Sequence, residues 1–321
     1  MHIYRWDLDR TYLDTDIHSV RGLLRAAVEP ASQKQNIPGS GALLRNLVRK
    51  DPGCRVVILS GSPTQMREVL AEKLALDGVR VDRLVLKDSL GSIRRGRFRA
   101  VTGQVGFKLP QLLKQRVGLG PRVHETLFGD DSEVDALVYT VYADAISGRL
   151  RENEVARIME AGGAYSDAIQ DGIKALRKIG RADAVDDIFI HCDRGVRVSQ
   201  FNKLGARVIP IFSWFQAAVV LWERGRLDTP GLENVARAVT EKGKLDERAL
   251  GGLIQDLVRR RLITPERVAV LLDDSTTLGS TRGPIERSLK HLGEPPPPPD
   301  YPRTPEYLGF LRSLKEKKAK S

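Results

Sequence analysis

Two aspartates separated by a single residue follow the first apolar segment of the chain. Asp7 and Asp9 come directly after residues 3–6, which are expected to form a short strand. In an extended segment, residues two apart point to the same side, so both carboxylates are expected to face one site. Hydrolysis of a phosphate ester through a covalent intermediate needs a nucleophile, a proton donor for the leaving oxygen and a cation. Asp7 is the candidate nucleophile, and Asp9 is the candidate acid that later activates water.

A serine ends the next strongly apolar segment. Ser60 follows residues 55–59, whose β-branched side chains are typical of a strand buried on both faces of a parallel sheet. Its hydroxyl is expected to donate to a phosphoryl oxygen, with Gly61 in support and the backbone N–H groups of the next helix start nearby. Ser62 precedes Pro63 and is expected to cap that helix instead.

A lysine and a group of aspartates supply opposite charges further along the chain. Lys108 lies at the start of an expected short helix, where its ammonium would neutralise both the nucleophile and the transferring group. Asp130 follows the expected strand 126–128 and is the candidate main ligand of a hard cation, because such ions prefer oxygen ligands. Asp131 and Asp135 are expected either to bind the ion through water or to orient its ligands.

The expected Mg²⁺ ligands are Asp7, Asp130 and Asp9, the last through its backbone carbonyl. Each signal alone also has a plain structural explanation. An Asp-x-Asp pair is common in solvated loops, Lys108 is one of many lysines, and the helix dipole favours acidic residues at a helix start. Their order along the chain, each at a strand end or a helix start, is what indicates a site.

Strands and helices alternate through the first two thirds of the chain. Strands are expected at 3–6, 55–59, 81–86, 126–128, 188–191 and 208–212, and helices at 63–76, 109–117 and 151–178. This alternation predicts an α/β fold with a parallel sheet and crossover helices. Ligands of such sheets bind at the carboxyl ends of the strands, where the candidate residues fall.

The remainder of the chain is expected to be helical. The α/β domain is expected to span residues 1–225, a helical region 226–294, and a proline-rich linker with a basic terminal helix and tail 295–321. Helices are expected at 232–261, 265–272 and 305–315, with Thr229 and Thr264 as caps of the first two. Trp214 and Phe215 lie in an apolar segment and are expected to be core residues.

Composition limits the class of protein and the kind of partner. The formal net charge of +11 favours anionic partners such as phosphate esters, nucleic acid or an acidic lipid surface, although it also serves solubility. No apolar run is long enough to cross a membrane, and the N-terminus lacks the apolar core of a signal peptide. Two cysteines without metal-ligand or pairing spacing are consistent with a reducing cytoplasm.

The candidate residues together resemble the four signature motifs of the haloacid dehalogenase (HAD) superfamily. Asp7-x-Asp9-x-Thr11, Ser60 after a strand, Lys108, and Gly129-Asp130 with Asp135 match these motifs in order. The segment up to about residue 140 more closely resembles the catalytic domain of actin-patch-associated phosphatidate phosphatases. Details shared with that family are Thr15, the segments 37–39 and 60–63, and Tyr139 four residues after the last aspartate. Asp131 departs from it, because serine is frequent there.

The resemblance implies a Mg²⁺-dependent phosphomonoester hydrolase with an aspartyl-phosphate intermediate and a Rossmann-like core, with Thr11 as a supporting site residue. The segments between Thr11 and Ser60 and between Ser60 and Lys108 are short, so we expect a minimal cap or none. An open site would suit a large substrate such as a lipid or another macromolecule.

Two alternatives remain open from the sequence. One is a phosphatase acting on nucleic-acid ends, which the net charge does not exclude, although nucleic acid is not the favoured partner. The other is a binding or regulatory protein that keeps the fold without turnover. The presence of Asp7, Asp9, Lys108 and Asp130 favours an enzyme, because a protein that has lost catalysis is expected to have lost at least one of them.

Overall fold

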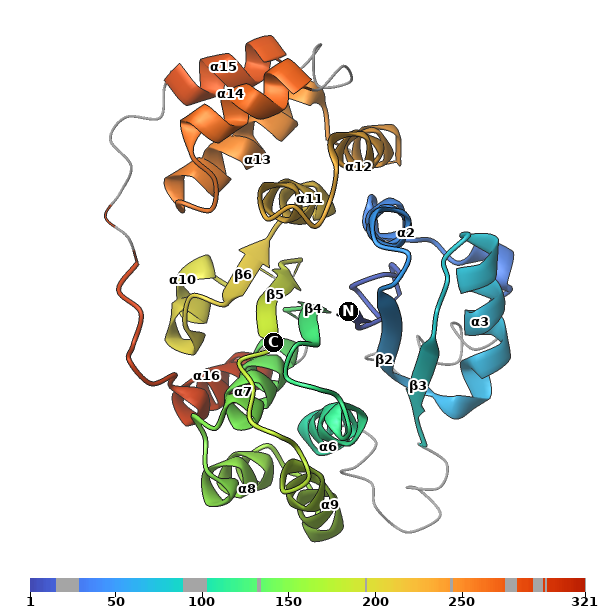
Figure 1. Cartoon of the computed structure of the whole chain (residues 1–321), viewed down its shortest axis with the longest axis vertical. Helices are drawn as coiled ribbons and strands as arrows, with labels where there is room; N and C mark the ends of the chain where they lie inside the picture. The colour runs from blue at the N-terminus through green and yellow to red at the C-terminus, as the bar shows by residue number, and fades with distance from the viewer. Residues whose placement is uncertain are drawn as a thin grey trace.

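A computed structural model describes residues 1–15, 29–88, 103–131, 134–193, 195–242, 245–274, 282–290, 297 and 299–320. These residues fold around a six-stranded sheet in which all paired strands are parallel (Figure 1). The expected α/β architecture with a parallel sheet is therefore confirmed. None of the described helices combines the length and the apolar character that crossing a bilayer requires.

The order of the strands reverses in the middle of the sheet. The strands are β1 (His2–Trp6), β2 (Arg55–Pro63), β3 (Arg83–Lys87), β4 (His124–Asp130), β5 (Val185–His191) and β6 (Val208–Ile211), and they lie in the order β3-β2-β1-β4-β5-β6. From β1 the chain builds outward to β3 on one side and then returns to β4 on the other. In open parallel sheets, ligands bind outside the carboxyl ends of the strands at such a reversal, which here lies between β1 and β4.

Helices cover both faces of the sheet. One face carries α2 (Ser40–Lys50), α3 (Arg67–Leu76), α11 (Trp214–Glu223), α12 (Thr229–Lys242), α13 (Glu247–Arg259), α14 (Pro265–Asp274) and α15 (Arg282–Lys290). The other carries α6 (Val105–Arg116), α7 (Asp135–Ser147), α8 (Glu152–Ala161), α9 (Ser166–Leu176), α10 (Val198–Phe201) and α16 (Tyr307–Lys320). Short 3₁₀ turns occur at Ala31–Gln33, Thr64–Met66 and Asn202–Leu204.

Alternation along the strands divides the core between these two faces. On β5, Phe189 joins the cluster under α2 and α11, whereas Ile188 and Ile190 join the cluster under α7. On β4, Phe128 and Leu127 divide in the same way. This is the period of two that a strand buried on both faces requires, and it explains the continuous apolar runs in the sequence.

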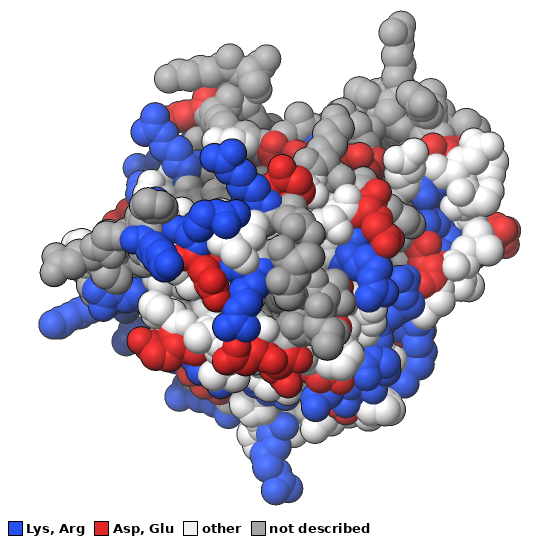
Figure 2. Space-filling model, turned by 90° about the horizontal axis from the view of Figure 1, so that it is seen from above, with Lys and Arg blue, Asp and Glu red and all other residues white. Residues whose placement is uncertain are grey.

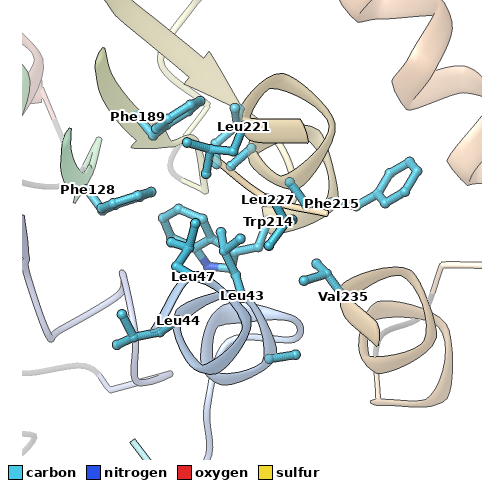
Figure 3. Packing of buried hydrophobic residues seen from close by; sticks show 14 of the residues in the cluster. Leu43, Leu44, Leu47, Phe128, Phe189, Trp214, Phe215, Leu221, Leu227 and Val235 are labelled. Carbon is cyan, nitrogen blue, oxygen red and sulfur yellow. The ribbon is translucent and has the colours of Figure 1, made fainter. Parts of the chain in front are cut away.

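An aromatic cluster supports the strand ends from one face. The rings of Trp6 and Phe128 stack with centroids 4.1 Å apart, and Phe128 stacks on Phe189 at 5.4 Å. Trp214 of α11 lies between these rings and the leucines of α2 (Figure 3). Trp214 and Phe215 are fully buried, so their assignment to the core is confirmed. Trp6 immediately precedes Asp7, and its packing therefore fixes the backbone that carries the candidate nucleophile.

Two helix predictions are wrong at their boundaries. The expected helix 63–76 begins only at Arg67, because β2 continues to Pro63 and a 3₁₀ turn follows. Ser62 is therefore a strand residue and caps no helix. The expected helix 232–261 consists of two helices, α12 and α13, and the side chain of Asp246 caps the second by accepting from the N–H of Ala249.

The two threonine caps differ in outcome. Thr264 accepts from the N–H of Arg267 at 3.3 Å, as expected for the cap of α14. Thr229 is itself the first residue of α12, and the carboxylate of Asp228 accepts from Gly231 N–H at 2.9 Å. The hydroxyl oxygen of Thr229 instead accepts a hydrogen bond from the indole N–H of Trp222.

The C-terminal helices pack on the α/β core. Helix α12 lies against α2 and α11, and residues of α13 and α14 belong to the same hydrophobic cluster as the sheet. Helix α16 returns to the opposite face, where Tyr307 donates to Asp144 of α7 at 2.5 Å (Figure 1). The division into domains at 225 and 294 stays a prediction, and most of the proline run 295–299 lies outside the described residues.

Candidate active site

The predicted site residues meet at the carboxyl edge of the sheet, on both sides of the switch point. Asp7 directly follows β1, and its N–H donates to Phe128 O at 2.9 Å, which extends the pairing of β1 with β4. Asp130 is the last residue of β4. Ser60 lies near the end of β2, on the other side of β1. Residues far apart in sequence thus reach one edge because parallel strands end there together.

Three buried carboxylates form the centre of this site. One oxygen atom each of Asp7, Asp130 and Asp135 lie within 4.8 Å of one another. Oxygen ligands of this kind suit a hard divalent cation such as Mg²⁺. Asp135, expected only in a supporting role, places its carboxylate in the group, whereas the carboxylate of Asp9 lies outside it. The contribution of Asp9 through its backbone carbonyl stays a prediction.

Lys108 joins two of these carboxylates. Its Nζ lies 2.9 Å from Asp7 Oδ1 and 2.5 Å from Asp135 Oδ1, and its side chain is fully buried. A buried charge is tolerated only when it is paired, so Lys108 needs a carboxylate partner and in turn stabilises both aspartates. The ammonium would lower the repulsion among three crowded carboxylates and attract an incoming phosphate.

Two helix starts place these charges. Lys108 lies in the first turn of α6, where its N–H donates to Gln104 O at 2.8 Å. Asp135 is the first residue of α7, so its carboxylate lies at the positive end of the helix dipole. Gly129 allows the close approach of α7, because a Cβ on Gly129 would lie 2.5 Å from Asp135 Oδ2. The glycine at the end of β4 is therefore required by the carboxylate that follows it.

The carboxylate of Asp9 is held by three hydroxyl groups. Ser60 and Ser62 donate to Asp9 Oδ2 at 2.9 and 2.8 Å, and Thr15 donates to Asp9 Oδ1 at 2.7 Å. Thr11 donates to the other aspartate, Asp7 Oδ2, at 3.3 Å. The two aspartates are thus oriented by different hydroxyl donors and have different surroundings.

The loop around the site is held by Asp131 and Arg10. Asp131 accepts from the N–H groups of Asp193 and Val196 at 2.9 and 3.2 Å, so the additional carboxylate organises the loop after β5. Arg10, in the left-handed conformation with φ 57°, forms an ion pair with Asp193 at 2.7 Å. Asp131 is not among the clustered carboxylates of the described residues, which favours its expected orienting role.

Some residues of the site carry weak signals in the sequence or none. Ser62 has the pattern of a cap, and Thr15 is distinguished only by the resemblance. Gln104 lies against Gly61, where a Cβ would come within 2.3 Å of its Nε2. Tyr139 packs behind the carboxylates, and burial, followed by the charge of Asp135, raises the pKa of its phenol well above the usual value. Its hydroxyl therefore stays protonated beside the site.

The candidate site residues are recessed. Asp7 and Asp130 are 1% and 2% exposed, and Asp9 is 7% exposed. The prediction of a minimal cap concerns mainly residues 16–28 and 89–102, which lie outside the described residues. Whether a cap is present therefore stays a prediction.

No protein-family model, curated protein or solved structure matches this chain. Its chemistry is accordingly inferred from its own residues. A buried carboxylate beside a lysine and two further carboxylates, with a second aspartate held by hydroxyl groups, can combine a nucleophile, a cation site and a proton donor in one place.

Proposed function

We propose that this protein is a Mg²⁺-dependent phosphomonoester hydrolase of the HAD type, with Asp7 as the nucleophile. The observation that carries the proposal is the position of Lys108, whose Nζ bridges Asp7 and Asp135 in the group that also contains Asp130. The three carboxylates have oxygen atoms within 4.8 Å of one another, and Lys108 Nζ lies 2.9 Å from Asp7, which supports their assignment as a nucleophile, cation ligands and a fixed positive charge. Each is needed where charge spreads over a transferring phosphoryl group.

The first chemical step transfers the phosphoryl group to the protein. An oxygen of Asp7 bonds to phosphorus as the bond from phosphorus to the leaving oxygen breaks. Asp9 donates its proton to that oxygen, and the alcohol departs. In the second step Asp9 takes a proton from water, the water oxygen bonds to phosphorus, and the bond to Asp7 breaks to release phosphate.

Mg²⁺ would be held by Asp7 and Asp130, with Asp9 O as a further ligand and Asp135 beside them. When bound, it supplies positive charge that stabilises the phosphoryl oxygens and the nucleophile in the reactive geometry. Lys108 supplies the fixed part of that charge from the protein side. The acidic group has the oxygen donors that this ion requires, which supports its assignment as the cofactor.

The substrate is expected to bind in this recessed site through a terminal phosphate group. Large, lipid or macromolecular phosphomonoesters remain the favoured class, because only their terminal phosphate must reach Asp7. On the face shown in Figure 2, basic side chains are interspersed with acidic ones among the described residues. The described residues of this face therefore do not form the continuous basic surface that a nucleic acid bound along its backbone would need.

Hydrolysis of 4-nitrophenyl phosphate with and without Mg²⁺ tests the proposal. We expect turnover in Mg²⁺, loss of turnover after chelation, and recovery when Mg²⁺ is added again. Phosphatidate in detergent micelles, assayed in parallel, tests the lipid class. Mg²⁺ binding without hydrolysis of either ester would contradict the proposal and favour a binding protein that keeps the fold without turnover.

A further inference from the structure

We propose that Ser62 and Thr15 are positioning residues, which hold the carboxyl group of Asp9 toward the leaving oxygen while Ser60 turns to the phosphoryl group. The inference rests on the proposed function and deepens it. It assigns a role to two hydroxyl groups that the reaction steps leave unused, and it divides the three hydroxyls around Asp9 into two kinds.

The contacts of Asp9 come from two separate segments. Thr15, in the loop after β1, holds Oδ1 at 2.7 Å, and Ser62, at the end of β2, holds Oδ2 at 2.8 Å. Both side chains are buried, with Ser62 fully so and Thr15 8% exposed. Because the two oxygens of one carboxyl group are held from different segments, its rotation about the Cβ–Cγ bond is restricted.

Ser60 differs from the other two donors. A serine hydroxyl has one hydrogen, so Ser60 cannot donate to Asp9 and to a phosphoryl oxygen at the same time. Its Oγ also accepts from the N–H of Ser62 at 2.9 Å, which fixes the oxygen while the hydrogen can rotate. A phosphoryl oxygen that arrives beside Ser60 would take this hydrogen without any movement of the backbone.

The local strand geometry supports this division. Ser60 and Ser62 are two residues apart in β2, so both reach the same carboxylate oxygen. The pairing of β2 with β3 shifts register between Ser60 and Pro63. Such irregularities reorient side chains at sheet edges and next to active sites. After Ser60 turns to the phosphate, Ser62 and Thr15 still hold Asp9.

The consequence appears in the dependence of the rate on the leaving group. An alkyl alcohol leaves slowly unless it is protonated, whereas 4-nitrophenolate is stable as an anion and needs little help from Asp9. Loss of the positioning hydroxyls should therefore slow the transfer from an alkyl phosphate far more than from 4-nitrophenyl phosphate. A hydroxyl that only stabilises the fold would affect both esters equally.

The test compares kcat/KM for an alkyl phosphate and for 4-nitrophenyl phosphate in the full-length Mg²⁺-loaded protein. This ratio reports the steps up to departure of the leaving group, so the hydrolysis of the intermediate does not mask the effect. For Ser62→Ala and for Thr15→Val we expect losses of about 10- to 100-fold with the alkyl ester and less than about 3-fold with the nitrophenyl ester. Ser62→Thr and Thr15→Ser should restore most of the loss.

Ser147→Ala is the matched control, because Ser147 donates to a backbone oxygen within α7, away from Asp9. It should leave both values unchanged. Equal losses with the two esters for both Ser62→Ala and Thr15→Val would overturn the positioning role while leaving the proposed function intact. Absence of turnover in the wild-type protein with both esters would instead overturn the proposed function, and this inference with it.

Discussion

Asp7→Asn is expected to abolish hydrolysis of every phosphate monoester that the wild-type protein accepts, with a loss of at least about 10⁴-fold in kcat. An amide oxygen is too poor a nucleophile to form the covalent intermediate, and water cannot use the site efficiently without it. The fold should survive, because Lys108 keeps its 2.5 Å contact with Asp135. Removal of one of three crowded carboxylates should leave the melting temperature unchanged or raise it.

The appropriate control is Asp171→Asn, which changes an exposed aspartate that pairs with Lys114 on the surface. This variant should keep wild-type turnover. Assays with 4-nitrophenyl phosphate and thermal unfolding of the same samples separate loss of chemistry from loss of structure. Turnover by Asp7→Asn above about a tenth of the wild-type rate would exclude Asp7 as the nucleophile.

The second large effect concerns the buried cation. Lys108→Met should lower the free energy of unfolding by about 3–5 kcal/mol in the absence of metal, because two buried carboxylates lose their shared partner. Mg²⁺ should restore part of this loss, since the ion supplies positive charge to the same carboxylates. The variant is therefore expected to gain more stability from Mg²⁺ than the wild-type protein does.

Lys114→Met provides a matched control six residues further along α6. Lys114 is 44% exposed, and its ion pair with Asp171 is a surface contact worth at most about 1 kcal/mol. Urea unfolding of both variants, with Mg²⁺ and with a chelator, measures the difference. A Lys108→Met protein that is as stable as Lys114→Met without metal would contradict the buried charge arrangement.

The sequence contains enough information to locate the site on the sheet. Asp7, Ser60 and Asp130 each follow an apolar run that is long enough for a strand and too short for a helix. In a parallel sheet such positions share one edge, so local patterns were sufficient to bring these residues together. Lys108 could also be assigned to the site from the sequence, because a lysine at a helix start between two of these strands can reach the same edge of the sheet.

The parts that could not be predicted depend on loop and strand-end geometry. Asp135 reaches the carboxylate group only because α7 begins at that residue and Gly129 allows its approach. Ser62 has the Ser-Pro pattern of a helix cap, but the strand continues through Pro63 and directs its hydroxyl to Asp9. For the segments around Asp135 and Ser62, local propensity is compatible with more than one structure. Long-range contacts decide which structure forms.

The C-terminal third illustrates a different limit. The sequence predicts helices there at 232–261, 265–272 and 305–315, but it misses α15 and does not indicate which surface each helix covers. Helix α16 packs against α7 through Tyr307 and Asp144, a pair separated by most of the second half of the chain. Such pairings are set by shape and by satisfaction of buried polar groups, which a pattern within one segment does not report.

Trapping the phosphorylated aspartate tests the central claim most directly. In Asp9→Asn treated with 4-nitrophenyl phosphate and Mg²⁺, nitrophenolate can leave without a proton donor, whereas hydrolysis of the intermediate lacks its base. The account predicts a burst of about one nitrophenolate per protein molecule. It also predicts acyl phosphate on Asp7, identified after borohydride reduction as homoserine at position 7 of the tryptic peptide Trp6–Arg10. Hydrolysis by the wild-type protein with no modification at position 7 in this variant would contradict it.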